Sequence, residues 1–290
     1  MICIIYMQKV IFFLKELVFK SISIDIITLN TKSLKLSEKI ELIIKKYYLV
    51  LVHIFLRKEV ILGQTYINIF NTKLYFDSKY GLAGFQTAFS TVYSFIEFLN
   101  TKEKKVIVDI GANVGNFSYL FAKSFKNCEI FSIEPIPEIF ETLKLNMQSF
   151  KNVKTFNCAI GETDTRRNMS YIREMGYLSR FSNNSGVEVS VLKLDSFVKK
   201  NNINKIDLLK IDVESFENLV LEGASETLKN VKYMMIEVSI FENENYTFTK
   251  LMSLLSKKDY DFQLISINTY SSGTKDLNLF DCILFNTKFK

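Results

Sequence analysis

Several residue types that mark other classes of protein are scarce in this 290-residue chain. It has no tryptophan, two prolines, one histidine and four cysteines, and no two cysteines form a C-x-x-C pair. Isolated cysteines argue against a metal cluster. Cys128, Cys158 and Cys282 lie in or beside apolar segments predicted as strands, where small buried thiols are common. This usage is typical of a reducing compartment, so we expect a cytoplasmic protein.

Long uncharged apolar runs are also lacking. Residues 1–19 are very apolar, but three charged residues interrupt them, and a signal peptide's basic leader and small-residue cleavage site are both missing. The uncharged run 47–56 is shorter than the about 20 residues that span a bilayer. We predict no transmembrane segment and two helices that bury one face in the protein, with peripheral membrane contact as the alternative. His53 lies in the second helix and is predicted to be structural.

Charge of one sign is not concentrated anywhere in the chain. The 37 Lys and Arg and the 31 Asp and Glu give a net charge of +6, and the lysines form only short clusters such as residues 102–105. A tail that binds nucleic acid usually carries a longer basic block. Nucleic acid is therefore not the partner that the sequence predicts.

The most informative segment is residues 106–116, which read V-I-V-D-I-G-A-N-V-G-N. An apolar run ends near Asp109, a Gly-x-x-x-Gly turn follows, and residues 117–125 are apolar at helical spacing, which predicts a buried strand, a tight turn and a helix. Gly111 and Gly115 let the backbone bend and let a ligand approach without a Cβ in the way. Asp109 is predicted to lie where the strand opens into a crevice, the usual ligand position in an open α/β sheet.

This turn favours S-adenosylmethionine (SAM) over a dinucleotide. The dinucleotide fingerprint G-x-G-x-x-G directs a helix N-terminus at a pyrophosphate. Here Asn113 stands in place of the second glycine, and the Asp109 carboxylate would repel a pyrophosphate. SAM carries an ammonium and a sulfonium but no phosphate, so an acid would attract it. We expect the cofactor to lie against Gly111, Ala112, Asn113, Gly115 and Asn116.

A second acid follows at the spacing that this architecture requires. Residues 129–133 are predicted to form the second strand, which ends at Glu134 and Pro135. An acid at the end of the second strand, about 20 residues past the glycine turn, is the usual ligand of the ribose hydroxyls. Pro135 and Ile136 could form an apolar shelf for adenine.

The adenine edge is predicted to meet the backbone. Many SAM enzymes place an acid near the end of the third strand, predicted here over residues 153–160, to accept from the adenine amino group. This chain has Cys158 there, which is a poor acceptor. We therefore expect adenine to contact the backbone around Ala159 and Ile160.

Four motifs together resemble the FkbM-type SAM-dependent methyltransferases. They are D-I-G-A-N-V-G at 109–115, I-E-P at 133–135, L-L-K-I-D-V-E-S-F-E at 208–217 and M-I-E-V at 235–238, within a resemblance that runs from about Gly63 to the C-terminus. The family usually has glycine after D-V-E, where this chain has Ser215. The resemblance implies methyl transfer to oxygen on a sugar, polyketide or other small-molecule or glycoconjugate acceptor.

The catalytic prediction centres on the ends of the fourth strand (206–212) and the fifth strand (233–238). The sulfonium of SAM already activates the methyl group, so the protein must mainly position the acceptor and help to remove its proton. Asp212, Glu214 and Lys210 are the candidates for proton removal. Alternatively, Asp212, Glu214 and Glu237 could bind Mg²⁺ and acidify an acceptor hydroxyl.

Alternating strands and helices predict a class I (Rossmann-like) α/β fold. We expect a mostly parallel seven-stranded sheet with helices on both faces over residues 99–290, closed by a hairpin of 262–267 and 280–285.

Residues 1–98 are predicted as an extension with helices at 7–19 and 37–57, a hairpin of 65–70 and 73–77, and a helix at 85–99 that leads into the sheet. Residues 161–186 are predicted as a polar connection near the crevice, where Arg166, Arg167, Arg173 and Arg180 could bind an anionic acceptor. Short strands are predicted at 166–172 and 187–192. Glu217 and Glu222 are predicted to form surface pairs on a helix.

Two other functions remain open at this point. Two classes of methyltransferase that act on other groups do not fit the sequence. Amino-group methyltransferases carry an Asn/Asp-Pro-Pro-aromatic turn where this chain has D-V-E-S-F, and cytosine C5 enzymes need a Pro-Cys nucleophile that this chain lacks. An NAD-dependent oxidoreductase is the enzyme alternative. A non-catalytic SAM- or nucleotide-binding module is the other, although the acids at four strand ends argue against it.

Overall fold

The computed structural model describes residues 22, 25–26, 28–29, 34–56, 65–70, 72–76, 103–125, 127–171, 179–182, 186–239, 248–269 and 279–289. The predicted helices at 7–19 and 85–99 lie outside these residues, and so does the side chain of His53.

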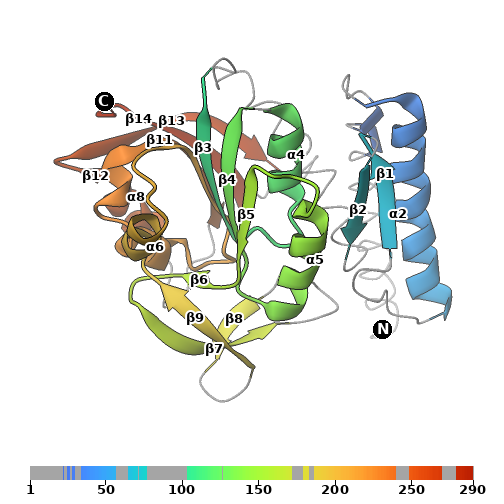
Figure 1. Ribbon diagram of the computed structural model, residues 1–290, viewed down its shortest axis with the longest axis horizontal. Helices are drawn as coiled ribbons and strands as arrows, with labels where there is room; N and C mark the ends of the chain where they lie inside the picture. Colours follow the sequence, from blue (N-terminus) through green and yellow to red (C-terminus); the bar gives the residue numbers. More distant parts are fainter. Residues whose placement is uncertain are drawn as a thin grey trace, which may run out of the picture.

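A mostly parallel sheet forms the centre of the molecule (Figure 1). Its eight strands, from one edge to the other, are β12 (Ser256–Lys257), β13 (Tyr260–Thr269), β14 (Leu279–Asn286), β11 (Val231–Ser239), β10 (Ile206–Ile211), β3 (Lys105–Ile110), β4 (Cys128–Ile133) and β5 (Val153–Phe156). The strands from β11 to β5 run parallel, and β14 is antiparallel to β11. The class I fold and its closing hairpin are confirmed, and the two-residue β12 is an eighth strand that the sequence did not predict.

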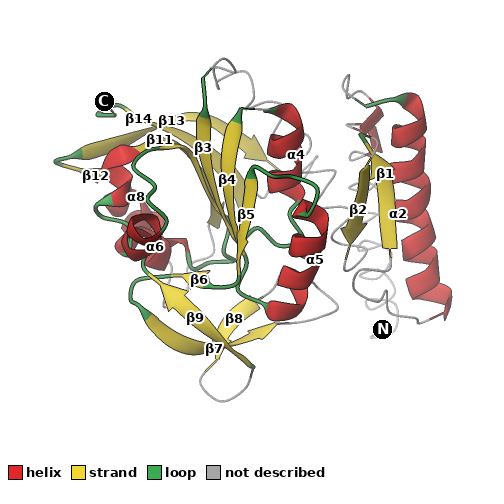
Figure 2. Ribbon diagram, in the orientation of Figure 1, coloured by secondary structure: helices red, strands yellow, loops and turns green. Residues whose placement is uncertain are grey.

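Helices cover both faces of this sheet (Figure 2). On one face lie α4 (Asn116–Ser124) and α5 (Pro137–Met147), and on the other lie α6 (Leu194–Lys200), α7 (Glu217–Glu222), the short 3₁₀ helix η2 (Thr227–Asn230) and α8 (Phe248–Leu255). Successive strand residues point to opposite faces, so Ile107 packs in the first cluster and Val108 in the second. Because both faces are buried, the parallel strands read as continuous apolar runs.

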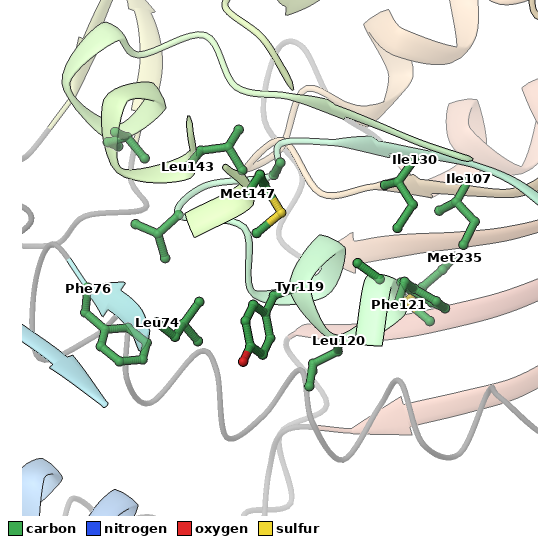
Figure 3. Packing of buried hydrophobic residues seen from close by; sticks show 14 of the residues in the cluster. Leu74, Phe76, Ile107, Tyr119, Leu120, Phe121, Ile130, Leu143, Met147 and Met235 are labelled. Atoms are coloured by element: carbon green, nitrogen blue, oxygen red, sulfur yellow. The ribbon is translucent and has the colours of Figure 1, made fainter. Parts of the chain in front are cut away.

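The predicted N-terminal hairpin is present and packs against the sheet domain. Its strands are β1 (Thr65–Ile69) and β2 (Thr72–Phe76), and they lie between α2 (Leu36–Leu56) and the helices α4 and α5 (Figure 1). Leu74 and Phe76 belong to the same hydrophobic cluster as Tyr119 of α4 (Figure 3). The hairpin therefore shares its core with the sheet domain. The division at residue 98 stays a prediction, because it lies outside the described residues.

Two buried polar side chains connect this hairpin to the glycine turn and α4. The Asn146 amide accepts from the Tyr75 N–H at 2.7 Å, and it donates to the carbonyls of Tyr75 at 2.8 Å and Val114 at 2.7 Å. The Tyr119 hydroxyl donates to the Ile69 carbonyl at 2.7 Å. The hairpin thus supports the turn that follows β3.

A second, four-stranded sheet corrects one prediction and confirms two short strands. Its order is β6 (Ala159–Ile160), β9 (Val187–Leu192), β7 (Thr165–Tyr171) and β8 (Ser179–Ser182). The predicted third strand at 153–160 is wrong as one element, because β5 ends at Phe156 and the chain enters the second sheet at Ala159. The short strands predicted at 166–172 and 187–192 are confirmed as β7 and β9, and β8, which pairs antiparallel with β7, was not predicted.

Candidate functional site

The turn after β3 adopts a backbone shape that depends on glycine. Gly111, Asn113 and Gly115 have φ values of 75°, 50° and 94°, in the left-handed region. A Cβ on Gly111 would lie 1.8 Å from the Asp212 carbonyl oxygen, and one on Gly115 would lie 2.7 Å from Leu143 Cδ1. Only glycine fits at the first position, because backbone atoms cannot move aside. The turn is therefore confined between the end of β10 and α5.

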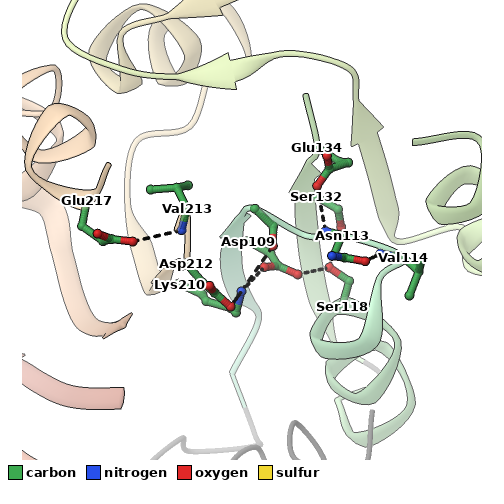
Figure 4. Close-up of polar contacts among 11 residues, drawn as sticks. Asp109, Asn113, Val114, Ser118, Ser132, Glu134, Lys210, Asp212, Val213 and Glu217 are labelled. Carbon is green, nitrogen blue, oxygen red and sulfur yellow. Dashed lines mark hydrogen bonds and ion pairs between the residues drawn. The ribbon is translucent and has the colours of Figure 1, made fainter. Parts of the chain in front are cut away.

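Asp109 lies under this turn, and its side chain is bound by Ser118 and Lys210 of the protein itself (Figure 4). It is buried, and its Oδ2 accepts from the Ser118 hydroxyl at 2.7 Å, while Ser118 Oγ lies 2.6 Å from Ser132 Oγ. Lys210 Nζ lies 3.4 Å from Asp109 Oδ1, which has no hydrogen-bond donor among the described residues. Asp109 is thus already paired with a cation of the protein, Lys210, and a direct role of Asp109 in cofactor binding stays a prediction.

Glu134 joins the glycine turn to the end of β4. It is buried, and its Oε2 accepts from the Asn113 N–H at 3.0 Å while its Oε1 accepts from the Ile136 N–H at 2.9 Å (Figure 4). The predicted position at the end of the second strand is confirmed, and the ribose contact stays a prediction. The predicted apolar shelf is reduced to Pro135, because Ile136 is completely buried.

Replacing Glu134 by alanine is expected to weaken SAM binding. A hydrogen bond to a charged group contributes about 1.5–3 kcal/mol, so loss of one such bond should raise the SAM Kd by roughly tenfold or more. Calorimetric titration measures this, with Glu141→Ala, an exposed residue of α5 that pairs with Lys144, as the matched control. Unchanged affinity in the Glu134 variant would show that the ribose assignment is wrong.

The predicted adenine contacts lie in the second sheet. Cys158, Ala159 and Ile160 are buried, and burial raises the pKa of the Cys158 thiol to about 11. The backbone contact with adenine stays a prediction. The residue that follows β5 is Asn157, which the sequence did not single out, and its amide donates to the carbonyls of Glu134 and Pro135 at 2.9 Å each. This pair of bonds holds the chain where it leaves the central sheet.

Lys210 is a fixed cation. Its ammonium is buried, lies 3.1 Å from Asp212 Oδ2 and 3.4 Å from the Gly111 carbonyl, and sits 4.8 Å from the centre of the Phe117 ring. Burial alone would lower the pKa of Lys210, but the carboxylates of Asp212 and Asp109 raise it above its ordinary value. A lysine must be neutral to accept a proton, so these surroundings do not favour Lys210 as the base, and its role in proton removal stays a prediction.

Acidic side chains form a row across the ends of β10, β11 and β14. Ile211 pairs with Ile236, so Asp212 follows beside Glu237, and Glu237 pairs with Asp281. Glu237 is only 9% exposed, whereas the Asp212 side chain is 31% exposed. Burial raises the pKa of Glu237 well above its ordinary value, and Asp212 and the neighbouring acids raise it further. The surroundings of Glu237 therefore favour its neutral form over its charged form, and Asp212 is the more accessible carboxylate.

The magnesium alternative has no support from this arrangement. Asp212 and Glu214 are close enough to Glu237 to raise its pKa. Within the part of the chain that the structure describes, however, His, Cys, Asp and Glu side chains form no group of three or more that could hold a metal ion.

The turn after Asp212 corrects the prediction for Glu217. That residue is 1% exposed, and its Oε1 accepts the N–H groups of Val213 and Ser215 at 3.2 Å each. It is therefore not a surface residue, because it faces back into the turn from the first position of α7. The prediction for Glu222 is confirmed, since its carboxylate pairs with Lys250 at 2.6 Å.

Replacing Ser215 by glycine is expected to stabilise the protein by about 1 kcal/mol. Ser215 has a φ of 74°, a left-handed conformation that is strained for a residue with a Cβ and open to glycine. Urea unfolding measures the change. Ser253→Gly, in the exposed part of α8, is the control and should cost about 0.5 kcal/mol through lost helix propensity. A Ser215→Gly protein no more stable than the wild type would show that the turn is not strained.

Comparison with known proteins identifies the family. The family model described as methyltransferase FkbM domain matches residues 109–264, more than half of the chain. The 2-O-methyltransferase NoeI of Sinorhizobium fredii is 25% identical over 167 residues, which cover 51% of this chain and 69% of that protein. The hexuronic acid methyltransferase AglP of Haloferax volcanii is 23% identical over 140 residues, which cover 47% and 57%.

The chain spans 57 to 69% of the length of the first four curated relatives. Among solved structures, M. capricolum TrmK in complex with S-adenosyl-homocysteine matches with a TM-score of 0.42 and 14% identity over 68% of each chain. On the match of the family model, this chain belongs to the FkbM methyltransferase family.

Proposed function

We propose that this protein transfers the methyl group of SAM to a hydroxyl oxygen of a sugar, glycoconjugate or other small acceptor. One observation carries the proposal: parallel strands bring the glycine turn, Glu134 and Asp212 to the same edge of the sheet. Ligands of open α/β sheets bind at this carboxyl edge. Family membership supports the reaction class, and the activities for which the relatives NoeI and AglP are named support a sugar acceptor.

The residues of the turn fit SAM. The left-handed backbone at Gly111 and Gly115 shapes the turn, and Asp109 Oδ1, which lies 3.4 Å from Lys210 Nζ, has no hydrogen-bond donor among the described residues. Glu134 brings a carboxylate to the end of β4. We propose that SAM is held by these residues together with Ala112, Asn113, Asn116, Pro135, Ala159 and Ile160.

The chain's own residues would then position the acceptor and take its proton. Bound SAM supplies a methyl group already activated by its sulfonium. Asp212 is the proposed base, because its carboxylate is partly exposed and Lys210 fixes its position at 3.1 Å. Glu237, at the neighbouring end of β11, is proposed to orient the acceptor through a hydrogen bond.

The charge of this edge favours a neutral acceptor over an anionic one. Among the described arginines of the second sheet, Arg166 pairs with Glu188 at 2.8 Å and Arg167 pairs with Glu162. Both are therefore neutralised, while the side chains of Arg173 and Arg180 lie outside the described residues. An anionic sugar would also meet the carboxylates at the ends of β10 and β11. We propose that a neutral sugar hydroxyl is methylated in preference to an acid-bearing sugar.

Two measurements test this function. Calorimetry with SAM and NADH should show binding of SAM alone, and binding of NADH alone would support the oxidoreductase alternative. Mass spectrometry should then show a methyl ether on neutral sugars from a panel that also holds uronic acids and RNA. Binding of SAM without transfer to any member of the panel would support a non-catalytic module.

We also propose that α2 contacts an anionic membrane surface peripherally. Leu36, Ile40, Ile44 and Tyr48 recur at helical spacing and are exposed, on the outermost helix of the view in Figure 1. The net charge of +6 favours an anionic lipid surface. No helix among the described residues is long and apolar enough to cross a bilayer. The free thiols of the described cysteines support a reducing compartment, and we propose the cytoplasm.

Ile44→Glu is expected to lower binding to phosphatidylglycerol vesicles at least about tenfold, because it places a charge on the apolar stripe. Vesicle sedimentation measures this. Met252→Glu, at an exposed apolar position of α8, is the control and should bind like the wild type. Wild-type binding by the Ile44 variant would show that the stripe does not contact lipid.

A further inference from the structure

The turn between β10 and α7 carries two candidate catalytic acids on a strained backbone. Asp212 begins this turn, and Glu214 and Ser215 follow with φ values of 56° and 74°. Each non-glycine residue in the left-handed region is strained, so two in succession persist only where their surroundings hold them.

The buried carboxylate of Glu217 stabilises this strained turn by hydrogen bonds, and this stabilisation is called the hold on the turn below. Glu217 Oε1 accepts the N–H groups of Val213 and Ser215, the residues on either side of Glu214 (the Val213 bond is drawn in Figure 4). Hydrogen bonds from N–H groups to a carboxylate are stronger than those between neutral groups. Because Glu217 is only 1% exposed, it acts on the turn and cannot meet an acceptor in solution.

We infer that Glu217 is a positioning residue that fixes the turn and thereby sets where Asp212 and Glu214 stand at the acceptor edge. The inference rests on the proposed methyl transfer, which it deepens. It predicts that Glu217 governs turnover and leaves SAM binding nearly unchanged, because the glycine turn and Glu134 lie on other strands.

The surroundings of Glu217 make this hold dependent on pH. Burial is the largest influence on the pKa of the Glu217 carboxyl, and together with repulsion from Asp212 it raises that pKa to about 7. The backbone N–H groups of Glu217, Val213 and Ser215 oppose this shift, because they bind the carboxylate. Glu237 on β11 is the other acid that interacts with it, and the nearest cation of the adjoining helix α8, Lys250, is paired with Glu222. The hold on the turn is therefore expected to strengthen as the pH rises through about 7 and the carboxylate forms.

Two substitutions separate positioning from mere stability. Glu217→Ala removes the acceptor, and kcat is expected to fall about tenfold or more, with the SAM Kd within about threefold of the wild type. Glu217→Gln keeps an acceptor oxygen without charge and should restore kcat to within about threefold at pH 6. The wild-type rate profile should show an inflection near pH 7 that Glu217→Gln lacks. Glu222→Gln, on the surface of α7, is the matched control and should change none of these values.

A readout independent of any acceptor is the NMR titration of the Val213 and Ser215 amides. Both should shift with a midpoint near pH 7 in the wild type and stay constant in Glu217→Gln. Wild-type kcat in Glu217→Ala, or equal loss in both variants, would overturn the inference. An inflection that persists in Glu217→Gln would overturn it as well, by assigning the titration to Glu237. Titrating amides in a wild type that transfers no methyl group would confirm the hold on the turn and overturn the proposed function instead.

Discussion

Asp212→Asn is expected to lower the turnover of methyl transfer by about 100-fold or more, the range of general acid–base effects. The substitution keeps the shape of the side chain and removes the charge that would accept the proton. SAM affinity should stay within about threefold, because Glu134 and the glycine turn are unchanged. Single-turnover rates on a neutral sugar acceptor, together with calorimetric titration of SAM, measure the two quantities separately.

The opposite end of the same strand offers a matched control. Asp207, in β10, pairs with Lys105 at 3.3 Å and accepts the Val106 N–H at 2.9 Å, far along the strand from Asp212. Asp207→Asn should therefore reduce stability and leave turnover nearly unchanged. Near-wild-type turnover in Asp212→Asn would remove Asp212 from the mechanism and leave Glu214 as the candidate base. Loss of wild-type activity in EDTA, restored by Mg²⁺, would show metal catalysis instead.

Strands buried on both faces explain why the sheet could be predicted from sequence. β3 and β10 read as short apolar runs that end beside a charged residue and a turn, so their positions follow from composition and length alone. The order of the strands follows once the family resemblance is accepted. The break after Phe156 could not be predicted in this way, because it depends on the bonds from Asn157 to carbonyls of a neighbouring strand.

The sequence placed the candidate residues on the strand ends where the structure has them, but it could not show how their side chains pair with one another. Lys210 and Asp212 are two residues apart, so their shared face was predictable. The register that places Asp109 opposite Lys210 comes from pairing between strands distant in sequence. Because this register places the Lys210 ammonium beside the Asp109 carboxylate, Lys210 is held as a cation, a role that the sequence did not predict. Glu217 shows the same limit, since a glutamate at a helix start is usually solvated, and only the path of the turn encloses it.

The largest effect on stability is expected at Lys210. Lys210→Met keeps most of the side-chain volume but leaves the Asp109 carboxylate buried beside Asp212 without its cation. Removing one partner of a buried ion pair costs about 3–5 kcal/mol, so the free energy of unfolding should fall by about that amount. Guanidinium unfolding at pH 7 measures this. Lys144→Met, which breaks an exposed pair with Glu141, should cost less than about 1 kcal/mol.

A second substitution identifies the origin of that loss. If it comes from the uncompensated charge, Lys210→Met combined with Asp109→Asn should recover most of it, because a buried pair replaced as a whole by neutral groups is often close to neutral. A double variant as unstable as Lys210→Met would trace the loss to other contacts of the lysine, such as that of its ammonium with the Phe117 ring, and would show that neutralising Asp109 is not its main contribution. Recovery would show that Lys210 is retained in this core to neutralise Asp109 and to hold Asp212 at the edge of the sheet.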